Sequence, residues 1–213
     1  MKIAILTSQN QWFVSYAEEL KKQLTGAEIF FHHKDINISF DIVFILSYHT
    51  LIEKQFLRIH KYNLVIHESA LPKGKGWAPM FWQILEGKDV IPFTMFEASE
   101  GIDNGPIYMQ KFLHLKGDEL NVELRKKQAN MIIDMCIEFI RNINLYCVPI
   151  KQKGEESFYE KRTEKDSELD INKTIKEQFN LLRIVDNDNY PAFFSIGTKK
   201  YKITIEEMHN ENR

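Results

Sequence analysis

The chain has 213 residues, of which 44% are hydrophobic and 27% charged, and its formal net charge is -2. This length allows one sizeable domain with a small addition, and the composition is that of an ordinary soluble globular protein. The near-zero charge disfavours a protein whose main activity is nonspecific nucleic-acid binding, because such surfaces need an excess of Lys and Arg.

Cysteine content and hydropathy further limit the classes of protein to which the chain can belong. The two cysteines, Cys136 and Cys147, form no Cys-x-x-Cys pair, so neither a zinc site nor a redox dithiol is predicted. The apolar run at residues 3–6 is too short for a signal peptide, and no window approaches the roughly 20 apolar residues of a membrane span. We therefore expect a cytoplasmic protein with no metal site and no membrane association.

Short apolar runs alternate with helical patterns through the first two thirds of the chain. Strands are predicted at residues 2–6, 27–31, 41–46, 63–67, 90–96 and 107–115, and helices at 13–24, 51–60, 78–85 and 121–143. This alternation is typical of an α/β fold, a Rossmann-like, largely parallel sheet with helices on both faces.

The composition shifts after Tyr146. Residues 151–168 are rich in charge and poor in apolar side chains, which predicts a linker or exposed loop, although an interface is a second possibility. Residues 171–184 have a helical pattern, and residues 192–196 and 201–205 are expected to pair as a hairpin. The expected division is a main domain over 1–150 and a short C-terminal α+β subdomain over 151–213.

One histidine ends a predicted strand. His67 closes the run NLVIH, and ligands in α/β sheets bind at the carboxyl ends of strands. In the following loop Pro72 fixes the exit direction, while Gly74 and Gly76 permit a close approach to a ligand. The competing interpretation is a structural histidine bonded to the backbone.

The stretch EGIDNGPI, residues 100–107, offers a partner for this histidine. Asp-Asn-Gly is first of all a tight-turn sequence. Taken with His67, however, Asp103 is typical of a carboxylate that orients a base, and we expect both side chains at strand ends on the same edge of the sheet.

Three segments, in order along residues 1 to about 195, resemble the formyltransferases that use 10-formyltetrahydrofolate. HESALPKGKGWAP is similar to their His-x-Ser-x-Leu-Pro-Lys segment, and EGIDNGPI to a second motif that ends in Asp-x-Gly. Residues 158–193 resemble the C-terminal region of the methionyl-tRNA and amino-sugar enzymes. The matching positions there are Tyr159, Lys161-Arg162, Leu169-Asp170, Asn180, Arg183 and Tyr190-Pro191.

The resemblance implies that residues 1–150 transfer a formyl group from 10-formyltetrahydrofolate to an amine. His67 would accept the amine proton or stabilise the intermediate, and Asp103 would orient the imidazole. The residues expected to bind the folate donor are Ser47, Tyr48, His49, Glu97, Gly101 and Ile102. The residues expected to bind the acceptor are Ser69, Lys73, Lys75 and Trp77.

These binding assignments have competing structural interpretations. The two lysines could meet a phosphate of a nucleotide-linked sugar, but lysines in loops are more often simply solvated. Trp77 could stack on the acceptor or belong to the core. Tyr48 and His49 could belong to a surface loop that binds no ligand.

One position departs from the family pattern. The Asn expected two residues before the histidine is replaced by Val65, and that Asn is expected to stabilise the formyl oxygen as negative charge develops. Asn63 lies about 13 Å back along the strand, at about 3.3 Å per residue, and cannot replace it. A backbone N–H, Ser69 or another loop residue is the expected substitute.

The leading hypothesis is an N-formyltransferase for a nucleotide-linked amino sugar. Methionyl-tRNA formyltransferase is the runner-up, disfavoured by the short segment after residue 150 and by the lack of positive charge. Glycinamide ribonucleotide formyltransferase, a hydrolase of the same folate and a non-catalytic folate-binding homologue remain alternatives. The sequence leaves open the sugar, the nucleotide and the formation of a homodimer.

Overall fold

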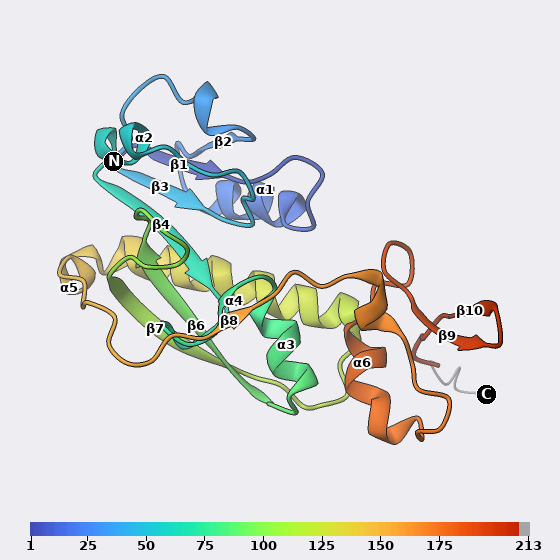
Figure 1. Cartoon of the computed structure of the whole chain (residues 1–213). Coiled ribbons are helices and arrows are strands. Elements are labelled where there is room, and N and C mark those ends of the chain that lie inside the picture. The colour runs from blue at the N-terminus through green and yellow to red at the C-terminus, as the bar shows by residue number, and fades with distance from the viewer. Residues whose placement is uncertain (209–213) are drawn as a thin grey trace, which may run out of the picture.

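The computed structural model describes residues 1–208, and its centre is a six-stranded sheet (Figure 1). The strands are β1 (Ile3–Leu6), β2 (Glu28–Phe30), β3 (Ile42–Ile45), β4 (Tyr62–His67), β6 (Val90–Glu97) and β7 (Ile107–His114). Their spatial order is β2-β1-β3-β4-β6-β7. The first four strands are parallel, whereas β6 runs antiparallel to both β4 and β7. The predicted α/β fold is confirmed, with antiparallel pairing at one side of the sheet.

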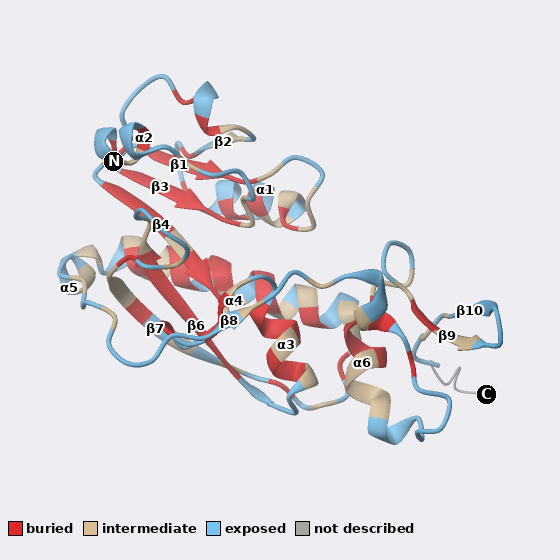
Figure 2. Cartoon of the chain, in the orientation of Figure 1, coloured by how far each residue is buried: buried red, intermediate tan, exposed pale blue. Residues whose placement is uncertain are grey.

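Helices cover both faces of this sheet. They are α1 (Val14–Gln23), α2 (Lys54–Ile59), α3 (Pro79–Leu85), α4 (Asn121–Arg141) and α5 (Ile143–Tyr146). Because successive side chains of a strand point to opposite faces, Phe44 and Leu64 join one apolar cluster with α1, α3 and α4, while Val43 and Ile45 join a second with Phe56 of α2. Figure 2 shows the buried residues concentrated in the strands and in the helices packed on them.

The segment after α5 is mostly irregular. It contains β8 (Phe158–Tyr159), which pairs in parallel with β5 (Lys75–Gly76), then α6 (Phe179–Ile184) and the hairpin of β9 (Ala192–Ile196) and β10 (Lys199–Ile203). The α-helix predicted from residue 171 begins only at Phe179. Upstream, Asp170 accepts the Asn172 N–H and Glu177 accepts the Thr174 N–H, so local side-chain bonds form turns there instead. The second hairpin strand begins two residues earlier than predicted because the connecting turn is shorter.

The C-terminal segment packs back onto the sheet domain. Helix α6 contacts α3 and α4, and its buried Arg183 pairs with buried Glu119 at 3.3 Å. Residues 151–168 are largely exposed, as predicted. They are more than a linker, however, because they run alongside the loop after β4 and their strand β8 pairs with β5 in that loop (Figure 1).

None of the helices within residues 1–208 is both long and apolar enough to cross a membrane. Within the same residues, no three His, Cys, Asp or Glu side chains gather as a metal site would require.

Candidate functional site

Strand β4 carries His67 at its carboxyl end. Since Leu64 and Ile66 pack in the cluster beneath α1 and α4, the alternation of side chains directs His67 to the opposite face of the sheet. The residue is only 7% exposed. Its Nε2 atom lies 2.8 Å from the carbonyl oxygen of Gly74 and 3.6 Å from Oδ2 of Asp103.

The surroundings of His67 assign its tautomer. A carbonyl oxygen and a carboxylate oxygen can only accept a hydrogen bond, so the Nε2 atom that faces both must carry the proton. Nδ1 then holds the free lone pair, and no residue among 1–208 donates to it. The arrangement leaves Nδ1 as the basic atom of the ring.

Asp103 reaches His67 by a route that differs from the prediction. Because β6 is antiparallel to β4, Glu97 at its end lies opposite Leu64, whereas His67 lies opposite Thr94. The β6–β7 loop therefore starts about 10 Å from the level of His67, at about 3.3 Å per residue. The expectation that both side chains follow strand ends on one edge is wrong. The loop folds back over the sheet and delivers Asp103 to the histidine.

Several contacts hold the loop in this position. Oδ2 of Asp103 accepts the Gly76 N–H at 2.9 Å, and Nε2 of Gln152 donates to the carbonyl groups of Asp103 and Gly105, both at 2.8 Å. Asp103 has a positive φ of 49°, which Asp and Asn tolerate better than most residues. A Cβ at Gly105 would lie 1.6 Å from the Glu97 carbonyl oxygen, so only glycine permits this crossing of the chain.

Lys75 has a different role from the one considered in the sequence. It is 1% exposed, and its ammonium group pairs with Glu156 at 2.8 Å and donates to Asn104. It is neither solvated nor free to meet a phosphate, because its donors already join three segments of the chain. Lys73, in contrast, is exposed.

The loop after β3 lies beside the loop after β4. Ser47 has a positive φ of 50°, and the ring of His49 stacks on Trp77 with centroids 5.4 Å apart. Burial and the neighbouring charge of Lys161 lower the pKa of His49. The Tyr48 hydroxyl instead forms a hydrogen bond with Nδ1 of His33 at 2.7 Å, so the Tyr48 side chain contacts His33 and not Trp77.

The remaining predicted donor contacts divide into two groups. Gly101 and Ile102 precede Asp103 in the folded-back loop and are carried toward His67 with it. Glu97 stays at the far end of β6, where its carboxylate accepts the Asn63 N–H at 2.8 Å and the Tyr108 hydroxyl at 2.8 Å. Burial raises the pKa of Glu97.

No amide lies where the family pattern has one. The Val65 side chain packs against the apolar cluster of α2. The Asn63 amide nitrogen donates to the Leu57 carbonyl and to Glu97, so its N–H groups are engaged elsewhere. Ser69 is 2% exposed, and its Oγ has no hydrogen-bond partner among the described residues. It packs against Gly74, the residue whose carbonyl meets His67.

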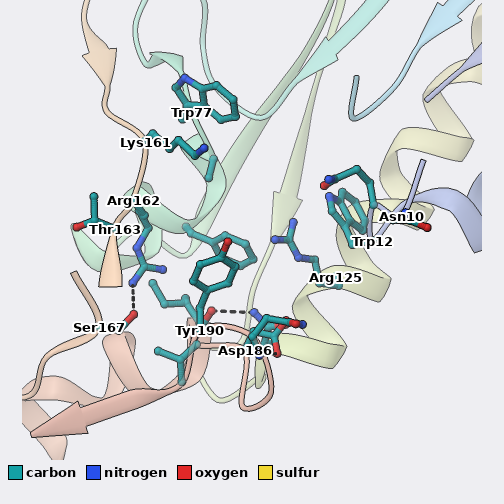
Figure 3. Close-up of a pocket in the computed structure, with 17 residues that line it drawn as sticks. Asn10, Trp12, Trp77, Arg125, Lys161, Arg162, Thr163, Ser167, Asp186 and Tyr190 are labelled. Atoms are coloured by element: carbon teal, nitrogen blue, oxygen red, sulfur yellow. Dashed lines mark hydrogen bonds between the residues drawn. The ribbon is translucent and has the colours of Figure 1, made fainter. Parts of the chain in front are cut away.

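A cavity with a volume of about 730 Å³ (Figure 3) is lined in part by Trp77, which follows Gly76, the residue whose N–H donates to Asp103. Trp77 is its one lining residue among the predicted site residues. The others come from the loop after β1, from α3 and α4, and from the C-terminal segment. They include Trp12, Arg125, Lys161 and Tyr190. Trp12 could have been found, because its loop follows a parallel strand. Arg125 gives no local signal within a helix rich in charge.

The chain is similar to known proteins over the same residues. A family model described as formyl transferase matches residues 32–138, which include His67 and Asp103. The methionyl-tRNA formyltransferase of Ehrlichia ruminantium (strain Gardel) is 32% identical over 165 residues, 76% of this chain and 52% of that protein. The chain thus spans about half the length of this curated relative.

Solved structures share the fold. A methionyl-tRNA formyltransferase from Clostridium thermocellum superposes with a TM-score of 0.81 and 22% identity, covering 100% of this chain and 95% of that one. A sugar N-formyltransferase from Shewanella sp FDAARGOS_354 gives a TM-score of 0.71 and 14% identity, with 99% of each chain covered. The two structural relatives differ in their acceptors, so the likeness supports the architecture and leaves the acceptor to chemical argument.

Proposed function

The chain belongs to the formyl transferase family, and on that premise we propose that it moves a formyl group from 10-formyltetrahydrofolate to the amine of a nucleotide-linked amino sugar. The observation that carries the proposal is the meeting of His67 with Asp103 at 3.6 Å. A base oriented by a carboxylate is what proton removal from an attacking amine requires. The adjoining cavity, lined by aromatic and cationic side chains, provides space for such an acceptor.

The folate donor is proposed to bind between two loops. Ser47, Tyr48 and His49 form the loop after β3, and Gly101 and Ile102 belong to the loop that carries Asp103. Backbone N–H and C=O groups of such loops can pair with the edge of a pterin ring. Glu97 is left out of this donor site, because both its oxygens already accept hydrogen bonds within the sheet.

The reaction then follows from the tautomer of His67. The amine nitrogen attacks the formyl carbon, and the electrons of the C=O bond move to its oxygen. Nδ1 of His67 takes the amine proton, while Nε2–H faces the Gly74 carbonyl and Asp103, which stabilise the imidazolium. Collapse of the intermediate restores the C=O bond and breaks the bond to the folate nitrogen, which takes the proton from His67. Such proton transfer contributes about 10²- to 10⁴-fold to the rate.

The developing oxyanion needs a hydrogen-bond donor that Val65 does not supply. Ser69 is our candidate, because its buried Oγ is unpaired within residues 1–208 and packs against Gly74. A backbone N–H of the donor loops is the alternative donor.

A donor–acceptor screen by mass spectrometry tests the proposal. Purified protein is mixed with 10-formyltetrahydrofolate and, separately, nucleotide-linked amino sugars, glycinamide ribonucleotide and Met-tRNA. We expect one amino sugar to gain the mass of a formyl group. H67N should lose this activity, whereas H114N, at an exposed histidine of β7, should retain it. Release of formate alone would indicate a hydrolase, and folate binding without turnover would indicate a non-catalytic homologue.

Met-tRNA is the second candidate acceptor. The observation that favours it is the 32% identity to a methionyl-tRNA formyltransferase. Formylation of Met-tRNA, with no amino sugar modified in the same screen, would replace the proposed acceptor while keeping the chemistry of His67 and Asp103. A homodimer stays a prediction that size measurements in solution can check.

A further inference from the structure

We propose that Arg125 is the anion-binding residue of the cavity and that the acceptor presents a phosphate or diphosphate group to it. This inference rests on the proposed function, because it takes the cavity beside Trp77 as the acceptor site. It names a specificity-determining side chain that the catalytic pair does not include.

The guanidinium of Arg125 is held by aromatic rings. Its central carbon lies 4.5 Å from the ring centroid of Trp12 and 4.4 Å from that of Phe81. Figure 3 shows the side chain reaching from α4 into the cavity beside Trp12. Contacts with two rings orient the planar group and remove water from around it. The charge is therefore placed in advance of any ligand.

The nearest acidic groups leave this charge without a close partner. Among residues 1–208, Arg125 forms no ion pair within 4 Å, and of its five N–H donors one forms a hydrogen bond, to Gln128. Glu68 accepts from Gln128, and Asp186 accepts from the backbone of Asp188 and Asn189.

Burial lowers the pKa of Arg125 to about 10, although the charges of Glu68 and Asp186 oppose the shift. The group therefore remains a cation at neutral pH. Because a partly desolvated cation with unused donors is costly to keep, an incoming anion gains a strong, charge-assisted contact there.

Two further cations line the same cavity. Lys161 lies 5.1 Å above the Trp77 ring, and Arg162 enters from the same segment. A group with more than one negative charge, such as a diphosphate, matches this clustering better than a single carboxylate. Trp12 and the exposed ring of Tyr190 offer faces for the rest of the ligand. The volume of about 730 Å³ lies within the usual range for small-molecule sites.

The chain connects this anion site directly to the catalytic pair. Trp77 follows Gly76, whose N–H holds Asp103. Lys161 comes two residues after Tyr159, which pairs with Gly76 in the β5–β8 ladder. An acceptor anchored at Arg125 by its phosphate thus has a route along this ladder for its amine to approach His67.

The test is binding of two probes, inorganic pyrophosphate and uridine diphosphate, measured by calorimetry and by the fluorescence of the lining tryptophans. We expect both probes to bind the wild type and uridine alone to bind far more weakly. R125Q should weaken binding of both probes by about 10- to 100-fold, the loss of a charge-assisted hydrogen bond or two. R125K should lie between, since it keeps the charge but loses the planar donor fork. R141Q, at an exposed arginine of the same helix, is the matched control.

The outcomes separate this inference from the proposed function. Equal affinity of R125Q and wild type for uridine diphosphate, or equal affinity of wild type for uridine and its diphosphate, would overturn the anion site. If R125Q fails to fold, R125K replaces it in the test. Unchanged pyrophosphate affinity in R125K would also overturn the anion site. Formyl transfer is measured separately. If the protein formylates an acceptor but the Arg125 substitutions leave diphosphate binding unchanged, the proposed function stands and the anion site is wrong. If diphosphate binds through Arg125 but no acceptor is formylated, the anion site stands and the proposed function is wrong.

Discussion

His67 and Asp103 lie with Nε2 and Oδ2 3.6 Å apart although the strands preceding them run in opposite directions. This separation is longer than a hydrogen bond, and Nε2 donates instead to the Gly74 carbonyl at 2.8 Å. Catalytic hydrogen bonds are often long before substrate binds. In the proposed mechanism, this carboxylate would stabilise the positive charge that His67 acquires on taking the amine proton.

Removing that negative charge should slow turnover without unfolding the protein. D103N keeps an oxygen to accept the Gly76 N–H and places Asn where φ is positive, which Asn tolerates. We expect kcat to fall by about 10²- to 10⁴-fold, because the imidazolium loses its partner. Steady-state kinetics measure the fall, and a thermal melt verifies the fold.

The control is D118N, an exposed Asp in the loop after β7, which should leave kcat unchanged. An unchanged kcat in D103N would remove Asp103 from the mechanism. A large drop in the melting temperature of D103N would instead mean that Asp103 mainly stabilises the fold, through its hydrogen bond to the Gly76 N–H.

A second prediction concerns the missing amide. V65N places a hydrogen-bond donor two residues before His67, where the family pattern has one. We expect turnover to rise by at least about tenfold, since one oxyanion donor typically contributes about 10²- to 10³-fold. Because Val65 packs against apolar side chains, stability should fall by about 1–3 kcal/mol.

V65A separates the amide from the loss of the valine. It adds no donor, so it should leave kcat near that of the wild type while also reducing stability. A fall of kcat in V65N would mean that the new side chain displaces the proposed oxyanion donor, Ser69, instead of adding a second donor to it.

Much of the sheet, and the residues His67 and Asp103 of the candidate site, could be predicted because their signals are local. Short, mainly apolar runs predicted all six strands of the sheet, and His67 lies at the end of one of them. Periodicity carries no strand direction, however, so the reversal of β6 and the fold-back of the loop to Asp103 were not predictable. Asp103 was predicted to lie near His67 from its turn sequence and its family motif, although the predicted path of the chain between them was wrong.

The supporting contacts depend on pairs far apart in the sequence. Glu156 neutralises Lys75 from 81 residues away, and Gln152 holds the Asp103 loop from 49 residues away. No pattern within residues 151–168 distinguishes these two polar side chains from their solvated neighbours. The same holds for Arg125, which becomes a cavity residue only when the C-terminal segment packs against α4.

The ion pair of Lys75 gives a third prediction. E156Q removes the carboxylate charge that neutralises the buried ammonium group of Lys75, and it leaves neutral partners beside it, Asn104 and the new amide oxygen. Because Glu156 is itself about half exposed, with a side-chain accessibility of 53%, water can replace part of the interaction. We expect the free energy of unfolding to fall by about 1–3 kcal/mol in urea titrations.

Two variants locate the cause of that fall. E155Q, at the exposed neighbouring carboxylate, should be neutral. The double variant K75M/E156Q should recover part of the loss, because it removes the unpaired charge. If the double variant is less stable than E156Q alone, the ammonium group stabilises the fold mainly through Asn104, and the ion pair is secondary.

The fourth prediction follows from Glu97, whose pKa is raised by burial. Between the ordinary carboxyl pKa and this raised value, the folded state binds a proton that the unfolded state has released. Stability must therefore fall as pH rises through that window, and level off above the raised pKa. E97Q keeps an acceptor for the Asn63 N–H and cannot ionise, so it should remove this part of the pH dependence.

Urea titrations from pH 4 upward compare the two proteins, with E18Q on the exposed face of α1 as the control. The difference in unfolding free energy, E97Q minus wild type, should grow as pH rises through the window and then stay constant. The control should show no such growth. A difference that shrinks with rising pH would reverse the sign, and would mean that hydrogen bonds from Asn63 and Tyr108 stabilise the ionised carboxylate more than burial disfavours it.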